Sequence, residues 1–233
     1  MTPRRHCVWD WNGTILDDNQ ARLLAVNESL AGLQIAPIDM QQYRDTYCVP
    51  VPDFYARLLG RPLTRDEWLT ADDTYQASYR RHLPHASHLM SGARAALLSW
   101  IARGGTQSLL SLHTHEHLLA ELSHHGVGTL FRLAEGRRGP TGGTKATAMR
   151  RHVQNLGLSP QQIVAIGDAA DDAVAADQAG IAVVLYTGGS HSRAALVATG
   201  APVAETLDEA LIIASTLPLA ELRARAAQVP TAA

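Results

Sequence analysis

The most reactive group in the sequence lies near its beginning, where a short apolar run ends in a carboxylate. The run Cys7-Val8-Trp9 is followed by Asp10, with Gly13 and Thr14 shortly after. Such a run is typical of a buried parallel strand, and ligands bind at the carboxyl ends of these strands. A carboxylate there can attack an electrophilic phosphorus atom and form an aspartyl-phosphate. Asp10 is therefore the candidate nucleophile.

More carboxylates follow a second apolar run late in the chain. Residues 163–166 lead into Gly167-Asp168, and Asp171 and Asp172 come next. Carboxylate oxygens are ligands that Mg²⁺ prefers, so Asp10 and Asp168 are candidate metal ligands. Asp172 could orient a metal-bound water, with Asp171 as the alternative. Acidic residues here could also simply stabilise the start of a helix.

One cation is singled out by its rarity. Lys145 is the only lysine, against nineteen arginines, and Thr144 before it is suited to cap a helix that begins there. An ammonium group at this place can bind a phosphate oxygen and offset the repulsion between Asp10 and a dianionic substrate. Lys145 is therefore a candidate catalytic residue.

Alternating strand and helix patterns predict the elements that position these groups. Residues 6–16 contain the first strand and its loop, and the alternation resumes near residue 91. It predicts an α/β fold with a doubly wound parallel sheet, because strands separated by helices pair in parallel. The expected strands are 107–111, 130–133, 162–167 and 181–185, and the expected helices are 92–103, 115–125, 145–156 and 171–179.

A helical insert interrupts this alternation. Helical patterns separated by prolines are expected at 21–33, 39–46, 52–60 and 65–82. The predicted organisation is an α/β core of residues 1–16 and 88–216, a helical cap of residues 17–87, and an alanine-rich C-terminal tail, 217–233.

Taken together and in order, the segments around Asp10, Ser111, Lys145 and Asp168 resemble the haloacid dehalogenase (HAD) superfamily, from Val8 to about Leu211. The resemblance implies a Rossmann-like core with a C1 cap, and residues 43–55 are similar to the cap of phosphoglycolate-phosphatase-like members. It further implies a Mg²⁺-dependent phosphatase that hydrolyses a small-molecule phosphomonoester.

The same resemblance implies further site residues. Ser111 and the backbone amide of Leu112 correspond to the motif that donates hydrogen bonds to the transferring phosphoryl group. The main-chain carbonyl of Asn12 corresponds to the third protein ligand of the metal, beside Asp10 and Asp168.

Asn12 departs from the phosphatase pattern, in which a second Asp protonates the leaving oxygen and later activates water. An asparagine cannot do this acid–base work. The rate is then low, another group such as His113 substitutes, or the leaving group needs no proton. Alternatives are a dehalogenase-type hydrolase, a weakly active or non-catalytic phosphate-binding protein, and a deliberate Asp-to-Asn change. A phosphonatase is disfavoured because the cap has no lysine.

Other polar and aromatic residues are candidate substrate contacts or alternatives to them. His113, His115 and His117 could form a transition-metal site, but surface histidines explain this spacing better. Trp9 is expected in the core, Trp11 at the cap interface, and loop 187–191 beside the substrate. The candidate substrate contacts are Thr14, Tyr43, Arg44, Tyr47, Leu112 and His113, with Asp53 as a further cap candidate.

Composition limits the partners and the compartment. The net charge of −2 predicts no general attraction to nucleic acid or to anionic membranes, and no apolar run approaches the length of a membrane span. The two cysteines, Cys7 and Cys48, do not indicate a disulfide scaffold. We expect a cytoplasmic monomer or homodimer whose partner is a small phosphorylated molecule.

Overall fold

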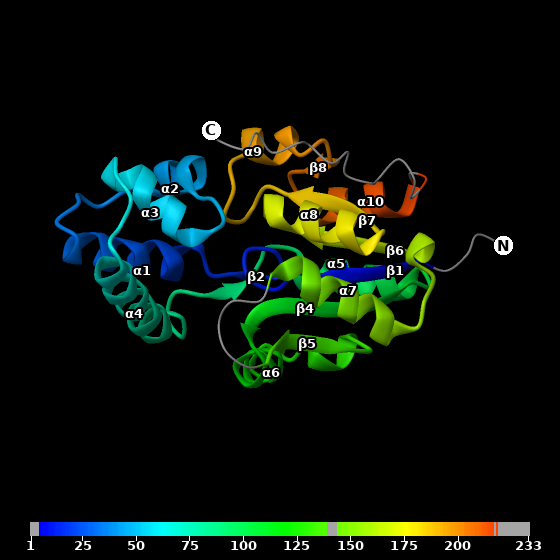
Figure 1. Cartoon of the computed structure of the whole chain (residues 1–233). Coiled ribbons are helices and arrows are strands. Elements are labelled where there is room, and N and C mark those ends of the chain that lie inside the picture. The colour runs from blue at the N-terminus through cyan, green and yellow to red at the C-terminus, as the bar shows by residue number, and fades with distance from the viewer. Residues whose placement is uncertain (1–4, 139–143, 217, 219–233) are drawn as a thin grey trace.

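The computed structural model describes residues 5–138, 144–216 and 218, and they form two adjacent lobes (Figure 1). One lobe is an insertion of four helices between the first two strands of the main sheet, and the other is an α/β core. The insertion contains α1 (Asn19–Gly32), α2 (Met40–Thr46), α3 (Val51–Leu59) and α4 (Arg65–His82). The four helices agree with the sequence prediction to within two residues at each end.

The core is built on a six-stranded sheet in which every adjacent pair is parallel. The strand order is β5-β4-β1-β6-β7-β8, so the connections run outward in both directions from β1. This confirms the doubly wound sheet. The strands are β1 (His6–Trp9), β4 (Thr106–Thr114), β5 (Ala134–Arg137), β6 (Ile163–Gly167), β7 (Ala182–Tyr186) and β8 (Val203–Ala204).

Alternate residues of the central strands feed two separate apolar cores. Trp9 and Ile166 point into one core, whereas Val8 and Ala165 point into the other. This period of two is what a sheet covered on both faces requires. The first core is closed by α5 (Ala93–Ala102), α6 (His115–His124) and α10 (Leu207–Thr216), and the second by α7 (Lys145–Leu156), α8 (Ala170–Ala179) and α9 (Arg193–Ala198).

A small antiparallel pair connects the lobes. The chain enters the insertion through β2 (Leu16–Asp17) and leaves it through β3 (His88–Leu89), and Leu16 pairs with Leu89. Neither strand has a clear sequence pattern, because two residues cannot show a period. The pair holds the insertion next to the carboxyl end of β1.

Several sequence predictions of the core were wrong in detail. Residues 130–133 are not a strand: Leu130 ends a 3₁₀ turn that begins at Gly128, and β5 begins only at Ala134. Strand β4 continues past Ser111 to Thr114, with an irregularity in its register between Leu110 and Thr114. Trp11 belongs to the core and donates to Glu121 of α6 instead of contacting the cap.

Trp9 lies in the core as expected. The predicted tail lies outside the described residues except for Pro218.

Two remaining sequence expectations concern thiols and membranes. Cys7 is buried and Cys48 is half-buried, and both are free thiols. Within the described part of the chain, no helix combines the length and the apolar character needed to cross a membrane.

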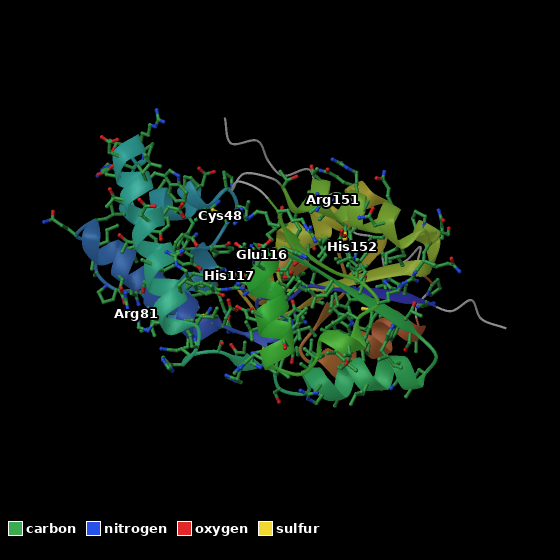
Figure 2. All side chains as sticks on the ribbon, turned by 90° about the horizontal axis from the view of Figure 1, so that it is seen from below. Cys48, Arg81, Glu116, His117, Arg151 and His152 are labelled. Atoms are coloured by element: carbon green, nitrogen blue, oxygen red, sulfur yellow. The ribbon has the colours of Figure 1, made fainter. Side chains whose placement is uncertain are left out.

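A chain of buried polar groups runs through the core on the side away from the cap. Nε2 of His6 lies 2.8 Å from Oγ of Ser108, which lies 2.7 Å from Nε2 of His152. Nδ1 of His152 lies 2.5 Å from a carboxylate oxygen of Glu135. Figure 2 shows His152 within the core lobe. Burial, then the charges of Arg132 and His152, lowers the pKa of His6 to about 4.

We expect the buried histidine His6 in this row of polar groups to destabilise the protein at acidic pH. In the unfolded protein His6 binds a proton below its ordinary pKa of about 6.5, whereas in the folded protein it stays neutral until about pH 4. The free energy of unfolding therefore falls as the pH drops from about 6.5 to 4. The loss is at most about 3 kcal/mol. The free energy of unfolding in urea, measured at pH 7.5 and 5, should fall more for the wild type than for His6→Gln. An equal loss of unfolding free energy between pH 7.5 and pH 5 in the two proteins would contradict this prediction.

Candidate active site

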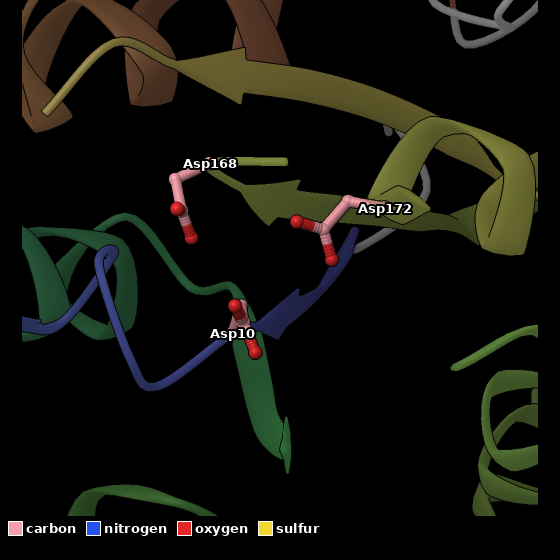
Figure 3. Close-up of side chains that lie close together, drawn as sticks. All are labelled: Asp10, Asp168 and Asp172. Carbon is pink, nitrogen blue, oxygen red and sulfur yellow. The ribbon is translucent and has the colours of Figure 1, made fainter. Parts of the chain in front are cut away.

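Adjacent strands bring Asp10 and Asp168 together. Trp9, the last residue of β1, pairs with Ile166 of β6, and the backbone amide of Asp10 donates to the carbonyl of Ile166 at 2.9 Å. Asp172 lies in the first turn of α8, which follows β6. One oxygen from each of the three carboxylates lies within 4.8 Å of the others, and Figure 3 shows them converging on one space.

Lys145 lies between two of these carboxylates. Its Nζ is 2.7 Å from Oδ1 of Asp10 and also pairs with Oδ1 of Asp172. Thr144 caps the helix, as expected, by accepting from the amide of Thr147 at 3.2 Å. Burial lowers the pKa of Lys145, but the two carboxylates outweigh this and raise it, so the ammonium group stays charged.

The cluster is short of positive charge. Burial raises the pKa of Asp10 to about 8; Lys145 opposes this, and the charges of Asp172 and Asp168 add to it. A nucleophile must be ionised to attack, so a further cation beside these carboxylates would favour the reactive form. The electrostatics therefore fit a divalent cation held by this acidic cluster.

The surroundings of Asp168 are suited to a fixed metal ligand. The backbone amide and the hydroxyl of Ser190 each donate to its Oδ2 at 2.8 Å, and the hydroxyl of Thr14 donates to its Oδ1 at 3.1 Å. Burial alone would raise the pKa of Asp168, but the charges of Arg22 and Lys145 and the hydrogen bonds from Ser190 outweigh burial and lower the pKa overall. Asp168 is therefore the anionic member of the cluster. Such outer contacts orient a ligand before the metal binds.

Two glycines allow the chain to approach Asp168 this closely. A Cβ atom on Gly13 would lie 2.5 Å from Oδ2 of Asp168, and one on Gly189 would lie 2.0 Å from the same atom. Gly13 also has a positive φ of 80°, which disfavours other residues. The loops after β1 and β7 therefore enclose this carboxylate from two sides.

Asn12 is held by a polar network between core and insertion. Its Nδ2 donates to Oδ2 of Asp18 at 3.1 Å and to the hydroxyl of Tyr79 at 2.9 Å. The Tyr79 hydroxyl donates to Asp18 at 2.7 Å, and Nε of Arg22 does so at 2.9 Å. Asp18 can only accept, so the amide nitrogen of Asn12 must face it. The amide oxygen then faces Ser111, whose Oγ lies at 3.4 Å.

A cavity of about 780 Å³ extends from the carboxylates into the insertion. It is lined by most of the residues assigned to substrate from the sequence, namely Tyr43, Tyr47, Leu112 and His113, and by Ser111. Tyr43 and Tyr47 stack with their ring centres 5.2 Å apart. Their roles remain predictions, but the structure brings them to the space in front of Asp10.

Three other residues assigned to substrate or cap contacts have different surroundings. The guanidinium of Arg44 donates to the carbonyls of Gly188 and Gly189, at 3.1 and 2.9 Å, and so joins the insertion to the loop after β7. Thr14 donates to Asp168. Asp53 is exposed in the first turn of α3. Arg44, Thr14 and Asp53 are not among the cavity-lining residues.

The three histidines near Ser111 do not form a metal site. Nε2 of His113 pairs with Glu121 at 3.1 Å, and Nδ1 of His115 accepts from the amide of Gly136 at 3.1 Å. Figure 2 shows His117 beside Glu116 on α6. Among the described residues, only Asp10, Asp168 and Asp172 form a group of three or more possible metal ligands.

Sequence reasoning missed four residues of the site: Asp18, Arg22, Tyr79 and Ser190. Asp18 had a visible signal, since it is an acid close to Asn12, although it seemed part of a helix start. Ser190 belongs to loop 187–191, which was expected near the substrate. Tyr79 comes from the far end of the insertion, and no local pattern could place it beside Asn12.

Comparisons with known proteins found similar sequences. A model of the HAD-hydrolase-like family matches residues 141–210. The phosphoglycolate phosphatase of Synechococcus elongatus is 25% identical over 197 residues, covering 82% of this chain and 87% of the relative. That of Haemophilus influenzae is 24% identical over 195 residues, covering 78% and 84%.

Solved structures share the fold. One described as a predicted phosphoglycolate phosphatase, from Haemophilus somnus, has a TM-score of 0.71 at 21% identity and covers 92% of this chain and 99% of its own. A haloacid dehalogenase-like family protein from Streptococcus pneumoniae has a TM-score of 0.77 at 20% identity and covers 91% and 99%. Residues 141–210 thus match the HAD-hydrolase-like family, and over most of its length the chain is similar to phosphoglycolate phosphatases as a distant homologue.

Proposed function

We propose that this protein is a Mg²⁺-dependent phosphatase that hydrolyses a small-molecule phosphomonoester through an aspartyl-phosphate. The observation that carries the proposal is the placement of Asp10, which directly follows the central strand β1, pairs with Lys145 and lies close to Asp168 and Asp172. Two relatives over most of the chain are phosphoglycolate phosphatases, which supports the same reaction class.

The first step forms a bond between an oxygen of Asp10 and phosphorus and breaks the bond from phosphorus to the leaving oxygen. Lys145 neutralises charge on Asp10 and on the phosphoryl oxygens, and Ser111 with the amide of Leu112 donates to those oxygens. In the second step water attacks phosphorus and the bond from phosphorus to the Asp10 oxygen breaks, which releases phosphate and restores the carboxylate; the proton that water loses and the proton that the leaving oxygen gains are exchanged with solvent. Asp10, Asp168 and the carbonyl of Asn12 would hold Mg²⁺, with Asp172 beside them, and the ion would supply positive charge that favours attack on the phosphoryl group.

Asn12 limits the proton transfers in both steps. Its amide oxygen can accept a hydrogen bond from the attacking water, but it can neither take that proton nor donate one to the leaving oxygen. The enzyme is therefore expected to prefer phosphate esters whose leaving group needs little help from an acid.

A screen for released phosphate tests the proposal. The full chain is incubated with sugar phosphates, nucleotides, small-acid phosphates and aryl phosphates, with and without Mg²⁺. Mg²⁺-dependent release from at least one ester is expected. A second candidate, a phosphate-binding protein without turnover, is favoured only by Asn12. Phosphate binding in calorimetry with no release from any ester would favour it.

Replacing Asp168 should weaken the metal site specifically. Asp168→Asn keeps the shape of the side chain but removes its charge, so we expect the Mg²⁺ concentration for half-maximal activity to rise at least about tenfold. Calorimetry with Mg²⁺ alone should show the same loss of affinity without substrate. The matched control is Asp53→Asn, which removes an exposed carboxylate outside the cavity. Unchanged Mg²⁺ affinity in Asp168→Asn would remove this residue from the metal site.

A further inference from the structure

The part of the cavity formed by the insertion is lined by aromatic and aliphatic side chains, and its polar members are Arg22, Asp72 and Gln76. Three of the aromatic rings are half-buried, whereas the other three are at most 2% exposed. Tyr47 packs edge-on against Phe54 with ring centres 5.5 Å apart, and Trp68 packs against Tyr55 at 6.1 Å. The rings that line the cavity are Tyr43, Tyr47, Phe54, Tyr55, Trp68 and Tyr75.

The charges of the cavity are distributed unevenly. Among the described lining residues the positively charged ones are Lys145 and Arg22, and each is already paired with a carboxylate. Asp72 adds a negative charge on the side of the insertion.

This lining does not suit a small phosphate ester whose organic part carries a carboxylate. The carboxylate of a phosphoglycolate-like substrate would have to lose its water among aromatic rings and near Asp72, which is costly without a free cation. The guanidinium of Arg44, another cation of the insertion, is engaged by the carbonyls of Gly188 and Gly189. An apolar group gains from the same surroundings, because it buries ring surface.

We infer that the preferred substrate is a phosphomonoester whose organic part is apolar, about the size of an aromatic ring or larger, and free of negative charge. This inference rests on the proposed phosphatase function and differs from what the names of the relatives suggest. Asp10 and its neighbours hold the phosphoryl end, and Tyr47, Trp68 and Tyr75 contact the organic end.

Three esters with similarly basic leaving groups separate recognition from chemistry. Methyl phosphate, benzyl phosphate and phosphoglycolate all release an alkoxide, so acid catalysis affects the three esters alike. Differences in kcat/KM between them therefore measure how the insertion recognises the organic part of the substrate. We expect kcat/KM for benzyl phosphate to exceed the other two by at least about tenfold, as burial of one ring implies. A preference for phosphoglycolate, or for phosphocholine as a cation bound by the rings, would overturn the inference.

The variant Trp68→Ala tests the rings directly. It should lower kcat/KM for benzyl phosphate about tenfold or more and lower that for methyl phosphate much less, and Trp68→Phe should retain most of the preference. The control Leu98→Ala removes an apolar side chain that is 49% exposed on α5 and lies outside the cavity. Equal losses for both esters in the Trp68 variants would show that the rings only stabilise the insertion.

Binding without turnover distinguishes this inference from the proposed function. Trp68 is half-buried in the cavity wall, whereas Trp9, Trp11 and Trp100 are at most 3% exposed. Benzyl phosphate should therefore change the tryptophan fluorescence of the full chain more strongly than phosphoglycolate, and Trp68→Phe should remove the difference. If no ester is hydrolysed, the proposed function fails, and this titration alone decides the inference: equal binding of the two esters would refute it.

Discussion

The variant Asp10→Asn should lose phosphate release by at least about 10³-fold while remaining folded. An amide oxygen is a poor nucleophile, so the covalent step stops, and no other described carboxylate faces the cavity from the end of β1. The pKa of Asp10 is raised by its burial, which means that folding disfavours its charged form above the unfolded pKa. Removing the charge at pH 8 should therefore leave stability equal or higher.

Phosphate release and thermal unfolding measured on the same preparation check this prediction. A rapid quench followed by intact-mass measurement should detect an added phosphoryl group on the wild type and none on Asp10→Asn. The matched control is Asp171→Asn, which neutralises a cavity-lining carboxylate that does not belong to the cluster of three. Turnover like that of the wild type in Asp10→Asn would rule out the covalent mechanism.

The fold could be predicted because its signals are local and repeated. Apolar runs such as 163–166, each closed by glycine or a polar residue, revealed the parallel strands, and prolines separated the helices of the insertion. The errors arose where local pattern is weak. Strand β5 has the sequence Ala-Glu-Gly-Arg, which no propensity favours, and it exists because β4 offers it a parallel partner.

The closeness of the carboxylates could be predicted for the same reason, and the cap side of the site could not. Parallel strands end at one edge of a sheet, so Asp10 and Asp168, which each follow such a strand, were expected near each other. The contacts of Arg44 depend on how the insertion sits on the core, which is set by side chains far apart in the sequence. Its guanidinium therefore joins helix α2 of the insertion to the loop after β7, where sequence reasoning expected a substrate contact.

The contacts of Asn12 determine what its replacement by aspartate should do to stability. Asn12→Asp removes the two hydrogen bonds that Nδ2 donates to Asp18 and Tyr79 and places a second carboxylate beside the Asp18 carboxylate. Two carboxylates this close cannot both ionise readily, so one of them retains a proton near neutral pH. The variant should lose about 1–3 kcal/mol of stability at pH 7.5, measured by urea unfolding.

The double variant Asn12→Asp with Asp18→Asn is the matched control for stability. Its new amide at position 18 can donate to the new carboxylate at position 12, so it should recover part of the lost stability. It also removes the neighbouring charge, which lowers the pKa of the new acid and makes it less available as a proton donor at pH 7.5. A double variant no more stable than Asn12→Asp would show that Asp18 does not govern this position.

For activity, Asn12→Asp should raise turnover of alkyl phosphates by up to about 10²-fold and that of aryl or acyl phosphates much less, because general acid catalysis helps in proportion to the basicity of the leaving group. The acid held beside Asp18 carries the proton that an alkoxide needs. Asn12 precedes Gly13 and can deamidate to aspartate. Intact mass must therefore show that the wild-type preparation still contains Asn12 before the activity of that preparation is assigned to the protein with Asn12. Unchanged or lower turnover of alkyl phosphates would mean that another acid already serves, and His113, which lines the cavity and pairs with Glu121, is then the first residue to replace.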